Sequence, residues 1–591
     1  MADSLGFAHT ERVVLFTEGD PLVLAGGTSL APVEVAYETY GTLNEARDNA
    51  VFVCHALTGD AHAAGHHGDP GRPGWWDNLI GPGKAVDTDR FFVISPNLLG
   101  GCQGSTGPTS VNPATGAPYG LDFPLLQMTD FVSVHRRLLT HLGIDRLHAA
   151  IGGSLGGMQV LQWAIDAPGQ VENAVVVAAS SRLTAQNIAF SAVAREAIMR
   201  DRDFADGRYV GTDSSPDIGL SIARMMAHIT YLSEEAMSEK FGRRLQGREL
   251  DADPGMGFGV DFQVESYLNH QGRSFLDRFD ALSYLYLTRV MDYFDPFTDP
   301  AAAPSVAHGG TRFLVVSFDS DWRFDTSHSR RIVRVLEHAG VPVSFREIRS
   351  PWGHDSFLLE VPGYHETIGA FLAAPDAGRP VNGTGSRPDL QVVAGLVPAG
   401  SRVLDLGCGE GDLLAALTRD HGCTGTGVEI DPEAVLTATR RGVPVIELDI
   451  DEELGEFGDA SYDVVVLSQT LQATYRPAEV LRQMARIGRT VIVSVPNFGL
   501  WRHRVSLLRG RMPVSRDLPH AWHATPNIHL STLTDLEALF AQTGLQVEQR
   551  VLLDEEGHPR TGARWANLRA AGAVYQLTAA SRPVPAERQR P

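Results

Sequence analysis

The chain has 591 residues, about twice the length at which one hydrophobic core usually stops growing, so more than one domain is expected. Hydrophobic residues make up 43% and charged residues 20% of the sequence, which excludes a disordered or fibrous chain and is typical of a globular enzyme. The formal net charge of -21 argues against a nucleic-acid partner, because such a partner requires clustered cations on the protein surface.

Cysteine usage and the chain's first residues both indicate a cytoplasmic protein. The four cysteines (Cys54, Cys102, Cys408 and Cys423) form no C-x-x-C pair, so the sequence predicts neither a disulfide scaffold nor a cysteine-rich zinc site. Residues 1–18 have no basic-then-apolar signal pattern, and no apolar run reaches the roughly 18 residues that span a bilayer. We therefore expect a cytoplasmic location and no membrane partner.

The first two thirds of the sequence predict an α/β fold. Short apolar runs alternate with longer helix-like segments; the runs are AVFVCHAL (50–57), FFVIS (91–95), LHAAI (147–151), AVVVAAS (174–180), FLVVSF (313–318) and VSFREI (343–348). This alternation predicts a mostly parallel sheet covered by helices. Residues 181–311 contain helical patterns but no comparable strand run, so they are expected to form a helical lid inserted between two strands.

A nucleophile elbow follows the third of these runs. Gly152 to Gly156 read G-x-S-x-G, after a predicted strand and before a predicted helix. In an α/β-hydrolase fold this turn raises a strained serine above the sheet, and the helix N-terminus behind it stabilises developing negative charge. An ordinary glycine-rich turn is the alternative, which the strand and helix context disfavours. Ser154 is thus the predicted nucleophile.

A serine nucleophile requires a base and an acid, which this fold supplies later in the chain, each on a loop after a strand. His354 follows the run at 343–348 and is the candidate base. Asp319 and Asp321 both follow the run at 313–318, and their spacing does not choose between them. The base would take the proton of Ser154, and the acid would fix the imidazole tautomer.

The tetrahedral oxyanion of such a reaction needs two backbone N–H donors. One should come from Leu155, which follows the nucleophile, as this fold requires. The other should come from Leu57 in the segment HALTG, directly after the first predicted strand.

Three histidines, His62, His66 and His67, lie close together just after that strand. Such a cluster can bind a metal, but no acidic partner accompanies it at the same spacing. We therefore expect these histidines to belong to a loop, and the sequence predicts no metal site.

Composition changes after residue 372. The segment LAAPDAGRPVNGTGSRP (372–388) has no apolar periodicity and predicts an exposed linker at 374–388, between domains at 1–373 and 389–577. Residues 578–591 have the same character and are expected to be a disordered tail. Between linker and tail a second α/β pattern occurs, with runs at RVLDLG (402–407), GTGVEI (425–430), VPVIELD (443–449), YDVVVLS (462–468) and TVIVSVP (490–496).

The first turn of this second domain is a cofactor-binding motif. It reads D-x-G-x-G-x-G, with Asp405, Gly407, Gly409 and Gly411, and this spacing favours S-adenosylmethionine over a dinucleotide. Glu429 ends the next predicted strand and is placed to accept hydrogen bonds from ribose hydroxyls. Asp449, after the third strand, is expected near the adenine. A phosphate-binding or ligand-free domain is the alternative. The fold class is Rossmann-like, of the S-adenosylmethionine methyltransferase type.

Residues 10–373 resemble the homoserine O-acyltransferase (MetX) family of methionine biosynthesis. The resemblance rests on YETYGTLN, VCHALTGDAH, NLLGGCQGSTGP, GGSLGGMQ, QNIAF, RFDALSYLYLTRVMDYFD and SDWRF…GHDSFL. It implies a triad of Ser154, Asp321 and His354, ping-pong transfer from an acyl-CoA substrate without a cofactor, and a homodimer formed through the lid helices.

The same resemblance implies substrate contacts from Arg224 and Tyr231 on the lid and from Asp355 beside the base. An amino-acid substrate offers a carboxylate to Arg224 and an ammonium group to Asp355. Arg323, in the segment SDWRF, resembles the succinyl-CoA users of the family, and its cation could reach the free carboxylate of a succinyl group. The expected substrates are therefore succinyl-CoA and L-homoserine. An acetyl donor, a serine acceptor and a hydrolase on the same triad are the alternatives.

Residues 389–554 resemble the methionine-biosynthesis protein W (MetW) family. The shared segments are GVEID, RGVPVIELDID, VVLSQTLQA, SVPNFGLWRHR, RGRMPVS and TPNIHL. The resemblance implies a methyltransferase-like partner of succinyl-type homoserine acyltransferases. We expect this domain to stabilise or regulate the acyltransferase, with an active methyltransferase as the alternative.

Overall fold

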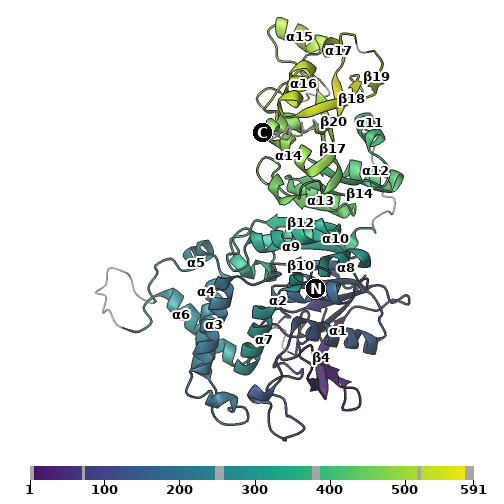
Figure 1. Ribbon diagram of the computed structural model, residues 1–591. Helices are drawn as coiled ribbons and strands as arrows, with labels where there is room; N and C mark the ends of the chain where they lie inside the picture. Colours follow the sequence, from purple (N-terminus) through teal and green to yellow (C-terminus); the bar gives the residue numbers. More distant parts are fainter. Residues whose placement is uncertain are drawn as a thin grey trace, which may run out of the picture. The chain divides into compact units, whose positions relative to one another are not determined.

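The computed structural model describes residues 5–68, 73–246, 258–375, 387–515, 521–562 and 564–579. The chain divides into two compact units, Met1–Leu372 and Ala373–Pro591, coloured purple to teal and teal to yellow in Figure 1. Most of the expected linker at 374–388 and most of the expected tail at 578–591 lie outside the described residues.

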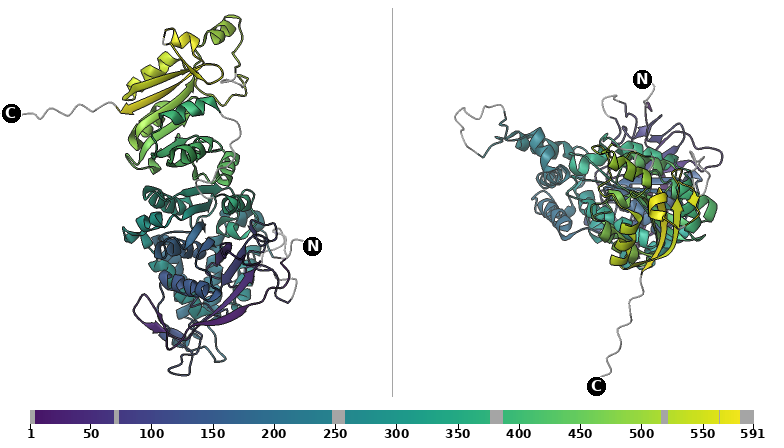
Figure 2. Two further views of the ribbon diagram at one scale, coloured as in Figure 1. Left: turned by 90° about the vertical axis from the view of Figure 1, so that its right-hand side faces the viewer. Right: turned by 90° about the horizontal axis from the view of Figure 1, so that it is seen from above.

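The sheet of the first unit has the order β1-β4-β8-β5-β9-β10-β11-β12. These strands are β1 (Glu11–Phe16), β4 (Val33–Tyr40), β8 (Phe92–Pro96), β5 (Ala50–Cys54), β9 (Leu147–Gly153), β10 (Val171–Val177), β11 (Arg312–Phe318) and β12 (Val343–Ile348). From β8 to β12 neighbouring strands are parallel, whereas β4 is antiparallel to both β1 and β8. Figure 2 shows the purple N-terminal strands at one edge of this unit.

Central strands of this sheet are buried on both faces, as parallel strands between helices must be. Every residue of β5 and of β11 is buried. Helix α2 (Leu155–Asp166) packs on β9 and β10, and α9 (Thr326–His338) packs on β11 and β12. Asp325 caps α9 by accepting the N–H of Ser327, and the helix buries Ile332, Val333 and Leu336. The remaining helices around the sheet are α1 (Met128–Leu142), α8 (Ala302–Gly309) and α10 (Tyr364–Ala373).

A group of helices lies between β10 and β11 in the chain and is the lid. It comprises α3 (Ala185–Met199), α4 (Asp217–Tyr231), α5 (Glu234–Lys240), α6 (Gln263–Leu276) and α7 (Ala281–Tyr293). Helix α3 packs against α4 and α7, and α4 packs against α6. Figure 1 shows α3 to α6 together on one side of this unit. None of the helices in the described ranges is both long and apolar enough to cross a membrane.

The second unit is a smaller α/β sheet with the order β15-β14-β13-β16-β17-β20-β18-β19. Its strands are β13 (Arg402–Leu406), β14 (Thr424–Glu429), β15 (Val445–Glu447), β16 (Tyr462–Ser468), β17 (Gly488–Pro496), β18 (Leu545–Leu553), β19 (Pro559–Arg560) and β20 (Gly572–Ala579). Neighbouring strands from β15 to β17 are parallel, whereas β20 is antiparallel to both of its neighbours, β17 and β18. The strand order reverses direction between β13 and β16, which in Rossmann-like sheets is where ligands bind.

Helices join the parallel strands of the second unit. They are α12 (Asp412–His421), α13 (Pro432–Arg440) and α14 (Pro477–Ile487). Helix α11 (Pro388–Leu396) precedes the first strand, and α15 (Trp501–Leu508), α16 (Leu533–Gln542) and α17 (Ala566–Arg569) lie toward the end of the chain. Helices α11, α13 and α14 carry proline in their first turn; in α13 it follows the N-cap Asp431. The predicted βα alternation is therefore present in both units.

Candidate active site

Ser154 occupies the turn between β9 and α2 and has the strained backbone of a nucleophile elbow. Its φ is 57° and its ψ is -122°, and its N–H donates to the carbonyl of Val177 at 2.9 Å. A Cβ on Gly152 would collide with the backbone of Gly156, and a Cβ on Gly156 would collide with the carbonyl of Cys54. The two glycines of the motif are therefore required by the close approach of strand and helix.

The three predicted triad residues come together and are buried. His354 Nε2 lies 3.0 Å from Ser154 Oγ, and His354 Nδ1 lies 2.7 Å from Asp321 Oδ2. The rings of Phe324 and Phe357 stand edge-on to the imidazole, with ring centroids 5.2 Å and 5.5 Å away. This geometry allows proton transfer from the serine hydroxyl to an imidazole whose other nitrogen is held by a carboxylate.

The structure distinguishes the two aspartates that sequence spacing leaves open. Asp321 Oδ1 accepts the N–H groups of Arg323 and Phe324, at 3.0 Å and 2.9 Å, which leaves Oδ2 directed at His354. Asp319 Oδ1 instead accepts the N–H of Ser350 at 2.9 Å. The acid beside His354 is thus Asp321.

The two expected oxyanion donors follow a strand end and begin a helix. Leu57 lies just after β5, and Leu155 is the first residue of α2, where an N–H has no intrahelical acceptor. Within the described ranges neither N–H donates to a backbone acceptor. Both groups are therefore available to a ligand.

The lid brings Tyr231 and Arg224 next to the triad. The ring centroid of Tyr231, the last residue of α4, is 5.7 Å from that of His354. The guanidinium carbon of Arg224 lies 4.7 Å from the ring centroid of Phe275 and 6.0 Å from that of Tyr231. Arg224 Nη1 is 3.5 Å from Thr58 Oγ1, and Thr58 directly follows Leu57, the residue of one expected oxyanion donor.

Arg323 lies on the same aromatic ring. Its guanidinium carbon is 5.5 Å from the ring centroid of Tyr231, and its Nη1 donates to Thr230 Oγ1 at 2.9 Å. Asn187 of α3 donates to the carbonyl of Arg323 at 3.0 Å, which joins the lid to the acid loop. Tyr231 thus contacts both guanidinium groups beside the base. Sequence analysis missed Thr230 and Asn187, although Asn187 belongs to the segment QNIAF that carries the family resemblance.

Asp355 directly follows His354 in a short 3-10 turn, Gly353–Leu358. Burial raises the pKa of its carboxyl, and the positive charges of His354 and Arg224 oppose that rise. A cation bound beside it would favour the ionised form. The residue is therefore suited to an ammonium ligand.

The glycine-rich loop of the second unit adopts backbone that favours glycine. Gly407, Gly409 and Gly411 have φ values of 67°, 54° and 80°. A Cβ on Gly407 would lie 2.5 Å from Thr470 Oγ1, whereas a Cβ on Gly409 would meet no atom within 4 Å. Glu429 Oε2 accepts the N–H of Gly409 at 2.8 Å. The loop therefore presents open space above a glycine whose N–H is held by Glu429.

The two remaining predicted residues of this loop region are Asp405 and Asp449. Asp405 is buried in β13, and burial, with the nearby charge of Glu429, raises its carboxyl pKa to about 7. Asp449 follows β15 and accepts the N–H of Asp451 at 2.8 Å. All six predicted positions thus lie toward the carboxyl ends of the neighbouring strands β13, β14 and β15.

Comparison with known proteins assigns both units. Residues 49–361 match the alpha/beta hydrolase fold, and residues 387–577 match the methionine biosynthesis protein MetW. A homoserine O-succinyltransferase of Nocardioides sp. is 64% identical over 372 residues, which are 63% of this chain and 100% of that protein. This chain belongs to the homoserine O-acyltransferase family. We call residues 1–372 the acyltransferase unit and residues 373–591 the MetW unit.

Other relatives of the acyltransferase unit carry two kinds of name. A homoserine O-succinyltransferase of Magnetococcus marinus is 55% identical, covering 62% of this chain and 95% of that protein. A homoserine O-acetyltransferase of Nitrobacter hamburgensis is 53% identical, covering 62% and 91%. Among solved structures, homoserine O-acetyltransferase from Bacillus anthracis is 29% identical with a TM-score of 0.57, covering 62% of this chain and 98% of that one. A family name alone therefore does not identify the acyl group.

The histidine cluster of the acyltransferase unit lies in the expected loop, but the expectation that it lacks an acidic partner is wrong. Glu38 of β4 places Oε2 3.1 Å from His62 Nδ1 and Oε1 2.7 Å from His67 Nε2. These groups could offer three ligand atoms to a metal ion, all within 4.8 Å of one another. The carboxylate also accepts the hydroxyls of Tyr40 and Thr10, so hydrogen bonds satisfy it without a metal. Sequence spacing missed Glu38 because strand pairing brings it to the loop.

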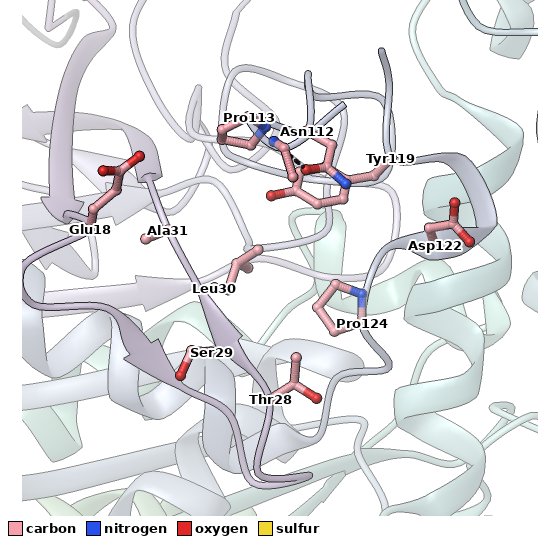
Figure 3. A pocket seen from close by; sticks show the side chains of 11 residues that line it. Glu18, Thr28, Ser29, Leu30, Ala31, Asn112, Pro113, Tyr119, Asp122 and Pro124 are labelled. Carbon is pink, nitrogen blue, oxygen red and sulfur yellow. Dashed lines mark hydrogen bonds between the residues drawn. The ribbon is translucent and has the colours of Figure 1, made fainter. Parts of the chain in front are cut away.

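A pocket of about 550 Å³ opens elsewhere in the acyltransferase unit, and Figure 3 shows it. It lies between two segments, residues 18–31 and 112–124, and carries the carboxylates of Glu18 and Asp122. None of the predicted site residues lines it. The predicted site residues therefore lie outside this pocket.

Proposed function

We propose that the acyltransferase unit is a homoserine O-succinyltransferase of methionine biosynthesis, acting in the cytoplasm on succinyl-CoA and L-homoserine. The observation that carries the proposal is the buried cation Arg323 on the ring of Tyr231, which itself stands beside the catalytic base. The names of the Nocardioides and Magnetococcus relatives support the same acyl group.

The geometry supports a two-step transfer. His354 Nε2 takes the proton of Ser154 Oγ while that oxygen attacks the thioester carbonyl of succinyl-CoA. The N–H groups of Leu57 and Leu155 hold the oxyanion, and the thiol of CoA leaves with the proton from His354. The hydroxyl of homoserine then gives its proton to His354 and attacks the succinyl ester. O-succinylhomoserine leaves, and Ser154 regains its proton.

Two anionic groups must be recognised over these two steps, and two cations are present. The carboxylate of homoserine would bind Arg224 and its ammonium group Asp355, while the free succinyl carboxylate would bind Arg323. The two arginines both contact the ring of Tyr231, which keeps their charges near the base. An acetyl group would leave Arg323 without a ligand.

The acyl group is tested by replacing Arg323 with leucine. The kcat/KM for succinyl-CoA should fall by about 10- to 100-fold, because a hydrogen bond to a charged group contributes about 1.5–3 kcal/mol. The kcat/KM for acetyl-CoA should change little. The exposed Arg334→Leu change on α9 is the matched control and should alter neither value. Use of acetyl-CoA as good as that of succinyl-CoA by the unaltered chain would contradict the proposal.

The acceptor is tested in the same assay with L-homoserine, L-serine and no amino acid. We expect O-succinylhomoserine as the main product. L-serine is the acceptor most difficult to discriminate from L-homoserine, because the two differ by one methylene, which changes the binding free energy by only about 1–3 kcal/mol. A crystal structure of an esterase, 30% identical with a TM-score of 0.55 and covering 62% of this chain and 100% of that one, makes hydrolysis the second candidate. Free succinate as the main product in the presence of homoserine would favour that candidate.

We propose further that the MetW unit binds S-adenosylmethionine and stabilises or regulates the acyltransferase unit, without supplying a catalytic group for acyl transfer. The residues fit this ligand, because Gly409 leaves open space and the Glu429 carboxylate, which accepts three backbone N–H groups, has about one lone pair left for a ribose hydroxyl. The ligand would supply a methyl group. Calorimetry on the whole chain should show binding that Glu429→Gln weakens. Absence of binding would contradict this proposal and leave the acyltransferase proposal intact.

We also propose that the lid forms a homodimer. Six apolar residues of α3 and α4 are exposed by 36% to 67%, namely Ile188, Val193, Met199, Ile218, Ile222 and Ile229. Exposed apolar residues grouped on neighbouring helices are typical of an interface. Light scattering should give twice the chain mass, and Ile222→Asp should give the chain mass. A monomeric unaltered chain would contradict the proposal.

A further inference from the structure

A buried histidine outside the triad contacts the oxyanion loop. His55 directly follows β5 and is 2% exposed. Its Nε2 accepts the N–H of Leu98 at 3.0 Å, and its Nδ1 lies 2.7 Å from the carbonyl oxygen of Ala56. Because the Leu98 N–H is a donor, Nε2 must be unprotonated and Nδ1 must carry the proton. Burial lowers the pKa of His55, which agrees with a neutral ring.

This tautomer fixes the orientation of one peptide group. The carbonyl of Ala56 and the N–H of Leu57 belong to the same planar trans peptide, so they point in opposite directions. His55 Nδ1 and the N–H of Gly59 both donate to the Ala56 carbonyl, the latter at 3.0 Å. Holding that oxygen therefore sets the direction of the Leu57 N–H on the other side.

A buried glutamine ties this loop to the helix of the nucleophile. Gln159 of α2 donates through Nε2 to the carbonyl of His55 at 3.1 Å and to that of Leu155 at 3.3 Å. Its Oε1 lies 2.9 Å from His135 Nε2, which fixes the amide orientation. One side chain thus connects His55, whose ring holds the Ala56 carbonyl, with Leu155, the residue of the second expected oxyanion donor.

We propose that His55 and Gln159 are positioning residues that hold the Leu57 and Leu155 N–H groups in place for the oxyanion. The inference rests on the proposed function, in which these N–H groups stabilise the tetrahedral intermediate. Donors fixed before the reaction cost no reorganisation when charge develops. Loss of either restraint should slow acylation without weakening substrate binding.

The first experiment replaces His55 in the full chain. His55→Leu removes the donor to the Ala56 carbonyl, and kcat for succinyl transfer should fall by about 10- to 100-fold. This fall should not exceed the one that follows removal of a whole oxyanion donor, about 100- to 1000-fold. The KM values should stay within about twofold, because the substrate contacts are elsewhere. His55→Asn returns an N–H near the position of Nδ1 and should recover most of kcat. Acylation by p-nitrophenyl acetate, read as nitrophenol release, should follow the same order.

The second experiment displaces the ring without removing it. A Cβ on Gly59 would lie 2.9 Å from the Cβ and 3.1 Å from Nδ1 of His55, so Gly59→Ala should lower kcat in the same way. Gly26→Ala is the matched control, since a Cβ there meets no atom within 4 Å. Gly59→Ala decides the question if His55→Leu does not fold.

Three outcomes would overturn the inference: an unchanged kcat in folded His55→Leu or in Gly59→Ala, a His55→Asn variant as slow as His55→Leu, or a loss confined to KM. The proposed function fails separately, if the unaltered chain reacts with p-nitrophenyl acetate but makes no acylhomoserine. In that case the nitrophenol comparison among the variants still tests His55.

Discussion

Asp321 illustrates how backbone donors decide the role of a carboxylate. Two N–H groups hold its Oδ1, so only Oδ2 faces His354. In Asp321→Asn the amide oxygen should take those N–H groups and turn the NH2 toward His354, which stabilises the wrong tautomer. We expect kcat to fall by about 10⁴-fold, as in other Ser-His-Asp triads.

The matched control for that change is Asp319→Asn. An amide oxygen can still accept the N–H of Ser350, so the activity of this variant should stay within a few-fold of the unaltered chain. Equal losses in the two variants, measured as kcat for CoA release, would contradict the assignment of Asp321 as the acid.

The raised carboxyl pKa of Asp405 predicts that the stability of the MetW unit depends on pH. Its carboxyl pKa is about 7 in the folded chain, above the ordinary 3.8, so the folded state binds more protons between those values. The free energy of unfolding should therefore fall as pH rises from about 4 to 7, by at most about 1.4 kcal/mol per pH unit. Asp405→Asn should remove this loss.

The measurement is thermal unfolding of the MetW transition at several pH values. The advantage of Asp405→Asn in melting temperature should grow between about pH 5 and pH 7 and level off above pH 7. A constant difference across this range would show that Asp405 does not titrate there.

Residues whose role depends on a local motif were predictable from sequence, and residues placed by distant strands were not. Ser154 lies in its own motif, and His354 follows a recognisable strand. Glu38 and His55 meet their partners only after β4, β5 and β8 pair, and no local pattern reports that pairing. The direction of the Asp321 carboxylate likewise depends on which N–H groups it meets.

At the scale of elements, one buried ion pair joins two lid helices. Arg195 of α3 and Asp292 of α7 lie 2.6 Å apart, with side chains 8% and 5% exposed. Removing one partner leaves a buried charge unpaired, so Asp292→Ala should lower the free energy of unfolding by about 3–5 kcal/mol. Urea denaturation measures this value.

The control for the lid ion pair is the apolar double change Arg195→Met with Asp292→Leu. Since apolar residues of similar size often replace a buried pair at little cost, its stability should lie within about 1–2 kcal/mol of the unaltered chain. A double variant as unstable as Asp292→Ala would show that packing, rather than the unpaired charge, causes the loss.

Apolar runs predicted the parallel strands of both sheets, including the end strands β12 and β15, but they did not predict β1, β4 or β18. β11 is buried along its whole length, and such strands read as continuous apolar segments. β1 and β18 are only partly buried, and charged or polar residues make up part of each, so neither reads as a continuous apolar segment. β4 was missed for a different reason, because it is mostly buried but the buried charged residue Glu38 interrupts its apolar pattern.

At the scale of the molecule, the acyltransferase unit should fold and act alone. The Nocardioides relative is matched over its full length by 63% of this chain, so a protein of this family exists without a second unit. We expect residues 1–375 to unfold cooperatively and to keep kcat and KM within a few-fold of the full chain.

Rates with succinyl-CoA and L-homoserine, measured on residues 1–375 and on the full chain at equal concentration, test this expectation. A folded but inactive fragment would show that the MetW unit is needed for catalysis. Added S-adenosylmethionine should not change the rate of succinyl transfer by the fragment, because the fragment lacks the glycine-rich loop.

Because both units belong to one chain, the cell makes them in equal amounts. A ribosome that finishes this chain makes one acyltransferase and one MetW unit, so their ratio is fixed at synthesis. Degradation of a chain in which either unit is unfolded removes both. A cell that holds these units in one chain therefore cannot adjust their ratio through gene expression, and any independent control of the two must act on the finished chain.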